Sequence, residues 1–140
     1  MKTLFWIFCL LSFQATSKSN ELNLLGGLYW NHTEEASLVI GGAYIIDSPT
    51  SEKLAEGELS QYLYADIEVG KNNKLATFGR GYKGLFGGSF RYGASIGRLD
   101  DSNVIGLVTT ASILTMSAKI GIYSSSENQS KLILGVGFQF

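Results

Sequence analysis

Hydrophobic and polar residues alternate along much of the chain with a period of two, the pattern of a β-strand whose side chains point to opposite faces. The alternation is clearest over Leu85–Leu99. One face of this stretch carries Phe86, Gly88, Phe90, Tyr92, Ala94 and Ile96, and the other carries Ser89, Arg91, Gly93, Ser95 and Gly97. Residues 131–140 repeat the pattern, so we expect another one-sided apolar strand there.

The same reading divides the rest of the chain into strand-like segments separated by polar turns. About eight strands are predicted: 22–30, 37–46, 58–69, 74–82, 85–99, two within 104–123, and 131–140. The turn inside 104–123 is expected near Thr110–Ile113, and 74–82, which contains Arg80, is the weakest strand. Residues 51–59 have the most helix-like sequence, but Gly57 interrupts them, so we expect a polar connection with a helical turn.

An even number of strands with short links predicts an all-β fold, an antiparallel transmembrane β-barrel of eight strands. The polar faces carry Asp66, Glu68, Arg91 and Lys119 among small residues. An eight-stranded barrel has an interior that side chains just fill, and a membrane barrel turns its apolar face outward. We therefore expect the two carboxylates to meet the two cations across the lumen.

A soluble sheet with a solvated polar face is the alternative to this reading. The fifteen residues of Leu85–Leu99 argue against it, because strands of soluble proteins are typically about 5–6 residues long. A strand of that length is ordinary in a barrel that extends past the bilayer. Few charged residues (16%) and a mean hydropathy of +0.13 also argue against disorder.

The first residues resemble an export signal. Lys2 precedes an apolar run of about 11 residues, which is too short for the roughly 20 of a membrane-spanning helix. Small residues at Ala15 and Ser17 favour cleavage before Lys18, so we expect a signal peptide over 1–17 and one barrel domain over 18–140. The single cysteine, Cys9, would leave with the signal peptide, which excludes disulfides and cysteine metal sites from the mature chain.

Residues with catalytic potential are few. His32, the only histidine, lies in a turn beside Glu34 and Glu35, and a histidine near carboxylates can act as a general base or bind a metal. An exposed turn histidine is the simpler interpretation, and no G-x-S-x-G motif is present. We expect no enzyme activity, metal or cofactor. The net charge of −1 gives no support for a nucleic-acid partner.

The last strand predicts how the barrel closes. Its apolar face is expected to contact lipid, while Gly135 and Gly137 face a crowded lumen. The strand should pair with Leu22–Trp30, and Phe140 should form part of a signal for the outer-membrane barrel assembly machinery. The lipid-facing set is Leu132, Leu134, Val136, Phe138 and Phe140.

The stretch Leu28–Glu35 (LYWNHTEE), followed by the glycine-bearing strand Ser37–Ile46, resembles the early hairpin of the YfaZ family of bacterial outer-membrane proteins. Gly84–Tyr92 and the terminal Phe-x-Phe also resemble segments of that family. The resemblance covers about half of the chain, which is shorter than expected for that family. It implies an outer-membrane barrel and transfers no catalytic residues.

The sequence therefore favours a cell outer-membrane β-barrel with a structural, adhesive or other envelope role and a lumen filled by side chains. Its expected partners are outer-membrane lipid and the assembly machinery. Two alternatives remain open: a secreted soluble barrel that binds an apolar ligand inside, and a lipid-modifying outer-membrane enzyme that uses His32.

Overall fold

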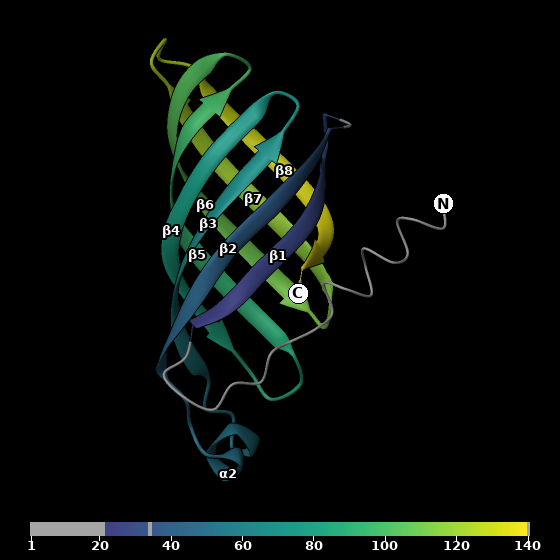
Figure 1. Ribbon diagram of the computed structural model, residues 1–140, viewed down its shortest axis with the longest axis vertical. Helices are drawn as coiled ribbons and strands as arrows, with labels where there is room; N and C mark the ends of the chain where they lie inside the picture. Colours follow the sequence, from purple (N-terminus) through teal and green to yellow (C-terminus); the bar gives the residue numbers. More distant parts are fainter. Residues whose placement is uncertain (1–21, 34, 140) are drawn as a thin grey trace, which may run out of the picture.

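The computed structural model describes residues 22–33 and 35–139. These residues form a closed barrel of eight antiparallel strands in which each strand pairs with the next and the last pairs with the first (Figure 1). The prediction of an all-β antiparallel barrel with eight strands is thus confirmed. The expected signal peptide over 1–17 lies outside the described residues.

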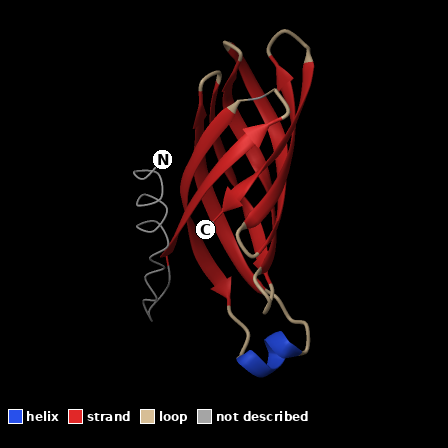
Figure 2. Ribbon diagram, turned by 90° about the vertical axis from the view of Figure 1, so that its right-hand side faces the viewer, coloured by secondary structure: helices blue, strands red, loops and turns tan. Residues whose placement is uncertain are grey.

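The strands are 10 to 12 residues long, close to the 9–11 that a strand needs to cross a bilayer. A short helix at one end of the barrel interrupts the connection between the second and third strands (Figure 2). The elements are β1 Leu22–Asn31, β2 Ala36–Asp47, α2 Ser51–Ala55, β3 Ser60–Gly70, β4 Asn73–Lys83, β5 Gly88–Leu99, β6 Ser102–Ile113, β7 Met116–Ser125 and β8 Ser130–Gln139. Within the described ranges, no helix has the length and apolar character needed to cross a membrane.

Two expected boundaries were wrong. The strand expected over 85–99 begins only at Gly88, because the preceding residues form a turn in which Gly87 adopts a positive φ of 73°. The turn expected at Thr110–Ile113 lies instead at Leu114 and Thr115. Leu114 has φ of 56°, a conformation that usually selects Gly or Asn, so the sequence carries no signal for this turn.

The two ends of the barrel differ in their connections. At one end, four short turns join consecutive strands: 32–35, 71–72, 100–101 and 126–129. At the opposite end, where β1 begins, the connection 48–59 carries α2 and is the longest in the barrel (Figure 2). We call these the turn end and the helix end.

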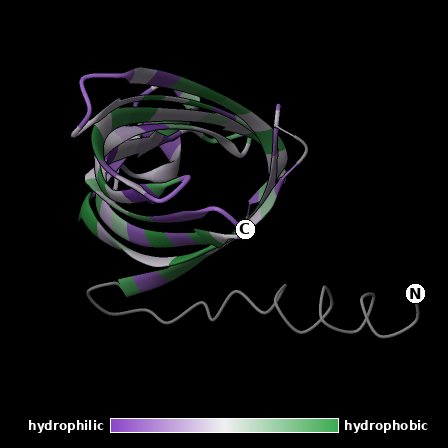
Figure 3. Ribbon diagram, turned by 90° about the horizontal axis from the view of Figure 1, so that it is seen from above, coloured by the Kyte–Doolittle hydropathy of each residue, from purple (hydrophilic) through white to green (hydrophobic). Residues whose placement is uncertain are grey.

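Side chains alternate between the lumen and the outside along every strand, and the changing colours along the ribbons in Figure 3 follow this alternation. The lumen contains two apolar clusters. One lies toward the turn end and consists of Leu75, Leu99, Val104, Val108 and Tyr123, with Ile133 packed against it. The other lies toward the helix end and consists of Ala43, Tyr62 and Tyr64, with Leu25 and Ile45 packed against it.

Glycines facing the lumen make room for buried tyrosine rings. A Cβ atom on Gly121 would lie 2.5 Å from Cε2 of Tyr123, and one on Gly93 would lie 2.8 Å from the hydroxyl oxygen of Tyr64. These distances are too short for any real contact. The glycines of the strands therefore allow a narrow barrel to hold large side chains, as its small diameter requires.

The closing ladder between β1 and β8 is the shortest in the barrel. Among the described residues it consists of five pairs, Gly27–Asn31 with Gly135–Gln139, whereas every other ladder has nine to twelve. The prediction that the last strand pairs with the first is confirmed, but over only half of β1.

Candidate functional site

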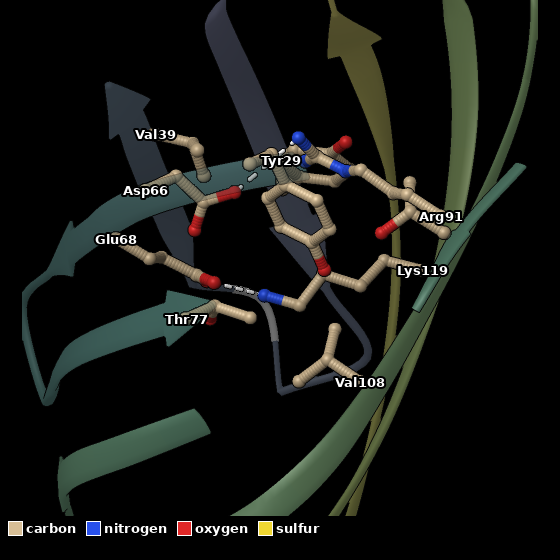
Figure 4. Close-up of a pocket in the computed structure, with 10 residues that line it drawn as sticks. Tyr29, Val39, Asp66, Glu68, Thr77, Arg91, Val108 and Lys119 are labelled. Carbon is tan, nitrogen blue, oxygen red and sulfur yellow. Dashed lines mark hydrogen bonds and ion pairs between the residues drawn. The ribbon is translucent and has the colours of Figure 1, made fainter. Parts of the chain in front are cut away.

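A layer of charged side chains crosses the lumen between the two apolar clusters. It contains the four residues singled out from the sequence: Asp66 and Glu68 from β3, Arg91 from β5 and Lys119 from β7 (Figure 4). All four are buried, with at most 7% of their surface exposed. Charges in a low-dielectric interior are costly unless they are paired. The contacts of these four side chains therefore decide whether the layer stabilises the barrel or has a group free to bind a ligand.

Glu68 is the most fully paired member of the layer. One carboxylate oxygen, Oε1, accepts a hydrogen bond from Ser37 Oγ at 2.6 Å and another from Asn73 Nδ2 at 3.0 Å. The other oxygen, Oε2, forms an ion pair with Lys119 Nζ. Both oxygens therefore have partners, and these partners come from three different strands, β2, β4 and β7.

Asp66 and Arg91 form the second ion pair, with Asp66 Oδ2 at 3.3 Å from Arg91 Nη1. The Arg91 guanidinium also lies over the ring of Tyr64, 4.9 Å from its centroid. Lys119 makes the matching contact with Tyr29, at 5.5 Å. Each cation thus has a carboxylate and an aromatic face as neighbours, which reduces the penalty of removing it from water.

Hydrogen bonds extend the polar layer toward β8. Gln139 Oε1 accepts from the Tyr29 hydroxyl at 3.0 Å and from Ser112 Oγ at 3.3 Å. The alternation pattern placed Gln139 on the lumen side, but no motif connects it to β1 and β6. Ser37 and Asn73 were not recognised as partners of Glu68, because small polar residues near strand ends resemble ordinary turn residues.

Very little space remains among these side chains. The cavity bounded by Tyr29, Asp66, Glu68, Arg91 and Lys119 has a volume of about 10 Å³ (Figure 4). A single water molecule needs roughly 10–15 Å³ measured in this way. The charged layer can hold one water molecule and has no room for a substrate or cofactor.

The loop candidates lie apart from this layer. His32 is exposed at the turn end, where its Nδ1 accepts a hydrogen bond from the Leu134 backbone N–H at 3.2 Å. Glu35 accepts a hydrogen bond from Asn72 Nδ2 across the turns, and Glu34 lies outside the described residues. Within residues 22–33 and 35–139, no serine or carboxylate forms a hydrogen bond with His32.

The C-terminal strand presents its apolar residues outward. Leu132, Leu134, Val136 and Phe138 are exposed on β8, and Phe138 packs edge-on against Trp30 with ring centroids 6.2 Å apart. Gly135 is buried, and a Cβ atom there would lie 3.0 Å from Asn31 Oδ1. Phe140 is outside the described part of the chain.

Comparison with known proteins gives no family for the chain: no family model, curated protein or solved structure matches it. In the described ranges, no group of three or more His, Cys, Asp or Glu residues is arranged to hold a metal ion.

Proposed function

We propose that the protein is an exported outer-membrane β-barrel with a structural role in the bacterial envelope. Its lumen is filled by side chains and does not form a diffusion pore for large solutes. The observation that carries this proposal is the inverted distribution of polarity. Large apolar side chains on the outward face of every strand are exposed, including Leu24, Ile40, Ile96, Leu107 and Val136. A water-soluble protein rarely exposes a continuous apolar surface of this extent, whereas lipid requires one.

Charge on the outward face is sparse and of one sign. Away from the terminal residues of the strands, the charged residues at outward positions of the described barrel are Lys74, Arg80 and Arg98. Lys74 and Arg98 are cross-strand neighbours near the turn end. This distribution suits a bilayer, because Lys and Arg side chains near the ends of the strands are long enough to place their charges in the headgroup region.

Closure of the backbone supports the same conclusion. A lipid-exposed strand must satisfy its N–H and C=O groups within the protein, which a closed barrel achieves. Strands of 10 to 12 residues also have the length to cross the apolar layer when tilted.

The packed lumen favours a structural role over transport or ligand storage. Apolar clusters occupy the lumen on both sides of the charged layer, and the space within that layer is about 10 Å³. A secreted barrel that binds an apolar ligand inside would need an apolar cavity of some hundreds of Å³. An adhesive role is also less favoured, because the turn end has only short connections to present to a partner.

Detergent fractionation tests the proposal directly. The protein should remain with the outer-membrane pellet in salt and carbonate washes and dissolve only in detergent. On an SDS gel, the unboiled barrel should migrate differently from the boiled chain. Recovery in the aqueous periplasm or medium without detergent would overturn the proposal and favour the soluble barrel.

A further inference from the structure

Arg80 occupies an unusual place on the outside of the barrel. It lies on β4 at an outward position, with Leu63 of β3 and Tyr92 of β5 as its cross-strand neighbours. Along β4, the next outward residues toward the turn end are Phe78 and Ala76. A cation on an apolar outer face is costly near the middle of a bilayer and much less so near the headgroups.

The side chain of Arg80 is fixed in place while much of its hydrogen-bonding capacity stays free. Nη2 donates to Gln61 Oε1 at 2.9 Å, and the guanidinium lies 6.0 Å from the centroid of the Tyr82 ring. Tyr82 in turn stacks on Tyr92, with centroids 6.4 Å apart. Nε is buried and donates no hydrogen bond to any described residue, so the N–H groups on Nη1 and Nη2 are the ones that an external phosphate can reach. A guanidinium has five N–H donors in a planar fork, a geometry that fits phosphate.

An apolar valley lies on the turn-end side of Arg80, which is not itself part of the lining. Its floor consists of Ala65 on β3, Ala76 on β4 and Ala94 on β5, and the register places Ala65 and Ala94 on either side of Phe78. Larger side chains surround this floor: Ile40, Ile67, Phe78, Ile96 and Ile105. The hollow has a volume of about 580 Å³, far larger than the space in the lumen.

We propose that Arg80 and this valley form a binding site for one membrane phospholipid. The lipid phosphate accepts hydrogen bonds from the Arg80 guanidinium beside the stacked rings of Tyr82 and Tyr92, and an acyl chain lies over the three alanines. This site rests on the proposed function, since it requires the outer face to contact a bilayer. The anionic phosphate matches the cationic Arg80, and the apolar acyl chain matches the apolar valley that follows it along the strands.

The surrounding charges are consistent with an anionic group at this position. Asp47 pairs with Gln61 in the register of β2 and β3, and no ion pair of the described residues includes Arg80. Arg80 therefore has no carboxylate partner among the described residues, and a phosphate would supply the missing negative charge.

The experiment uses the full barrel folded in a non-ionic detergent and measures retained lipid by native mass spectrometry. The probes are dioleoyl phosphatidylglycerol, the same diacylglycerol without phosphate, and dihexanoyl phosphatidylglycerol. The wild-type protein should retain one long-chain phosphatidylglycerol in preference to the other two. Arg80→Gln should reduce the affinity by about tenfold or more, as expected for the loss of charge-assisted hydrogen bonds.

Lys74→Gln is the matched control, because it removes an outward cation from the same strand at the opposite end and should leave binding unchanged. Ala94→Leu fills the valley without touching Arg80, so it should weaken long-chain binding and leave the short-chain lipid unaffected. Equal lipid retention by wild type and Arg80→Gln, or equal losses in Arg80→Gln and Lys74→Gln, would overturn the site.

A shift on unboiled gels, measured on the same samples, reports whether each variant is folded. A chain that needs no detergent and retains no lipid would overturn the proposed function together with this site. A folded, detergent-dependent barrel without the Arg80 effect would overturn the lipid site alone.

Discussion

Glu68 on β3 and Lys119 on β7 form an ion pair across the full diameter of the barrel, because their strands are four positions apart in either direction around the closed sheet. The pair links opposite walls that share no backbone hydrogen bond. Ser37 and Asn73 extend this link to β2 and β4 through the same carboxylate.

Replacing one partner of this pair should destabilise the barrel strongly. Lys119→Met leaves Glu68 buried without its cation, and breaking a buried pair in this way typically costs about 3–5 kcal/mol. Urea unfolding of the barrel in lipid vesicles measures the change in unfolding free energy. The double variant Glu68→Gln/Lys119→Met should recover most of it, since the amide oxygen still accepts from Ser37 and Asn73. A double variant as unstable as Lys119→Met alone would contradict the charge-pair explanation.

Two glycines on β5 should respond oppositely to the same substitution. A Cβ atom on Gly93 would collide with the Phe78 carbonyl oxygen and lie 2.8 Å from the Tyr64 hydroxyl, so Gly93→Ala should destabilise the barrel by about 1–3 kcal/mol. The nearest atom to a Cβ atom on Gly88 is Ser112 O at 4.0 Å, so Gly88→Ala should be neutral or stabilising. Urea midpoints of the two variants provide the comparison. Equal effects of the two substitutions would mean that the space around Gly93 can accept a methyl group, against the close packing of Phe78 and Tyr64.

The outward face offers a test that separates a membrane barrel from a soluble one. Leu107 lies in the middle of β6 and is 70% exposed. In a bilayer, Leu107→Arg should cost about 2–4 kcal/mol, whereas Ser124→Arg, near the end of β7, should cost about 0–1 kcal/mol. The yield of folded protein in vesicles, read from unboiled gels, reports the difference. Identical yields for the two variants would argue against contact with lipid at Leu107.

The turn between β6 and β7 contains strain that a glycine should relieve. Leu114 is exposed and adopts φ of 56°, which is unfavourable for a residue with a branched apolar side chain. Leu114→Gly should therefore raise the unfolding free energy by about 1 kcal/mol, whereas Thr115→Gly, which has no such φ to relieve, should not. A lower urea midpoint for Leu114→Gly would show that its side chain makes contacts that outweigh the strain.

The alternation of side chains explains why much of this fold could be predicted. It placed Asp66 and Glu68 on one face of β3 and Arg91 on the same side of β5, and a closed barrel brings those faces together. The resemblance to the YfaZ family remains an expectation, because no comparison bears on it.

Other features left no trace in the sequence. The turn at Leu114 lacks the glycine or asparagine that usually marks such a conformation. The partners of Glu68 depend on the stagger between strands, and a one-residue change in register would have moved Ser37 to the outside. Arg80 was recognised only as a charge in a weak strand, because its environment is formed by β3 and β5.

The short ladder between β1 and β8 has a consequence for how the chain folds. Seven of the eight ladders join strands that follow one another along the chain, so each forms between segments that are close in sequence. The eighth brings together residues such as Tyr29 and Gln139, which are 110 positions apart. Entropy opposes closing so long a loop, although each doubling of loop length adds only about 0.6 kcal/mol. Among the described residues, five pairs must offset this loss, so we expect completion of the cylinder to be the slow, final step of a process that is otherwise local.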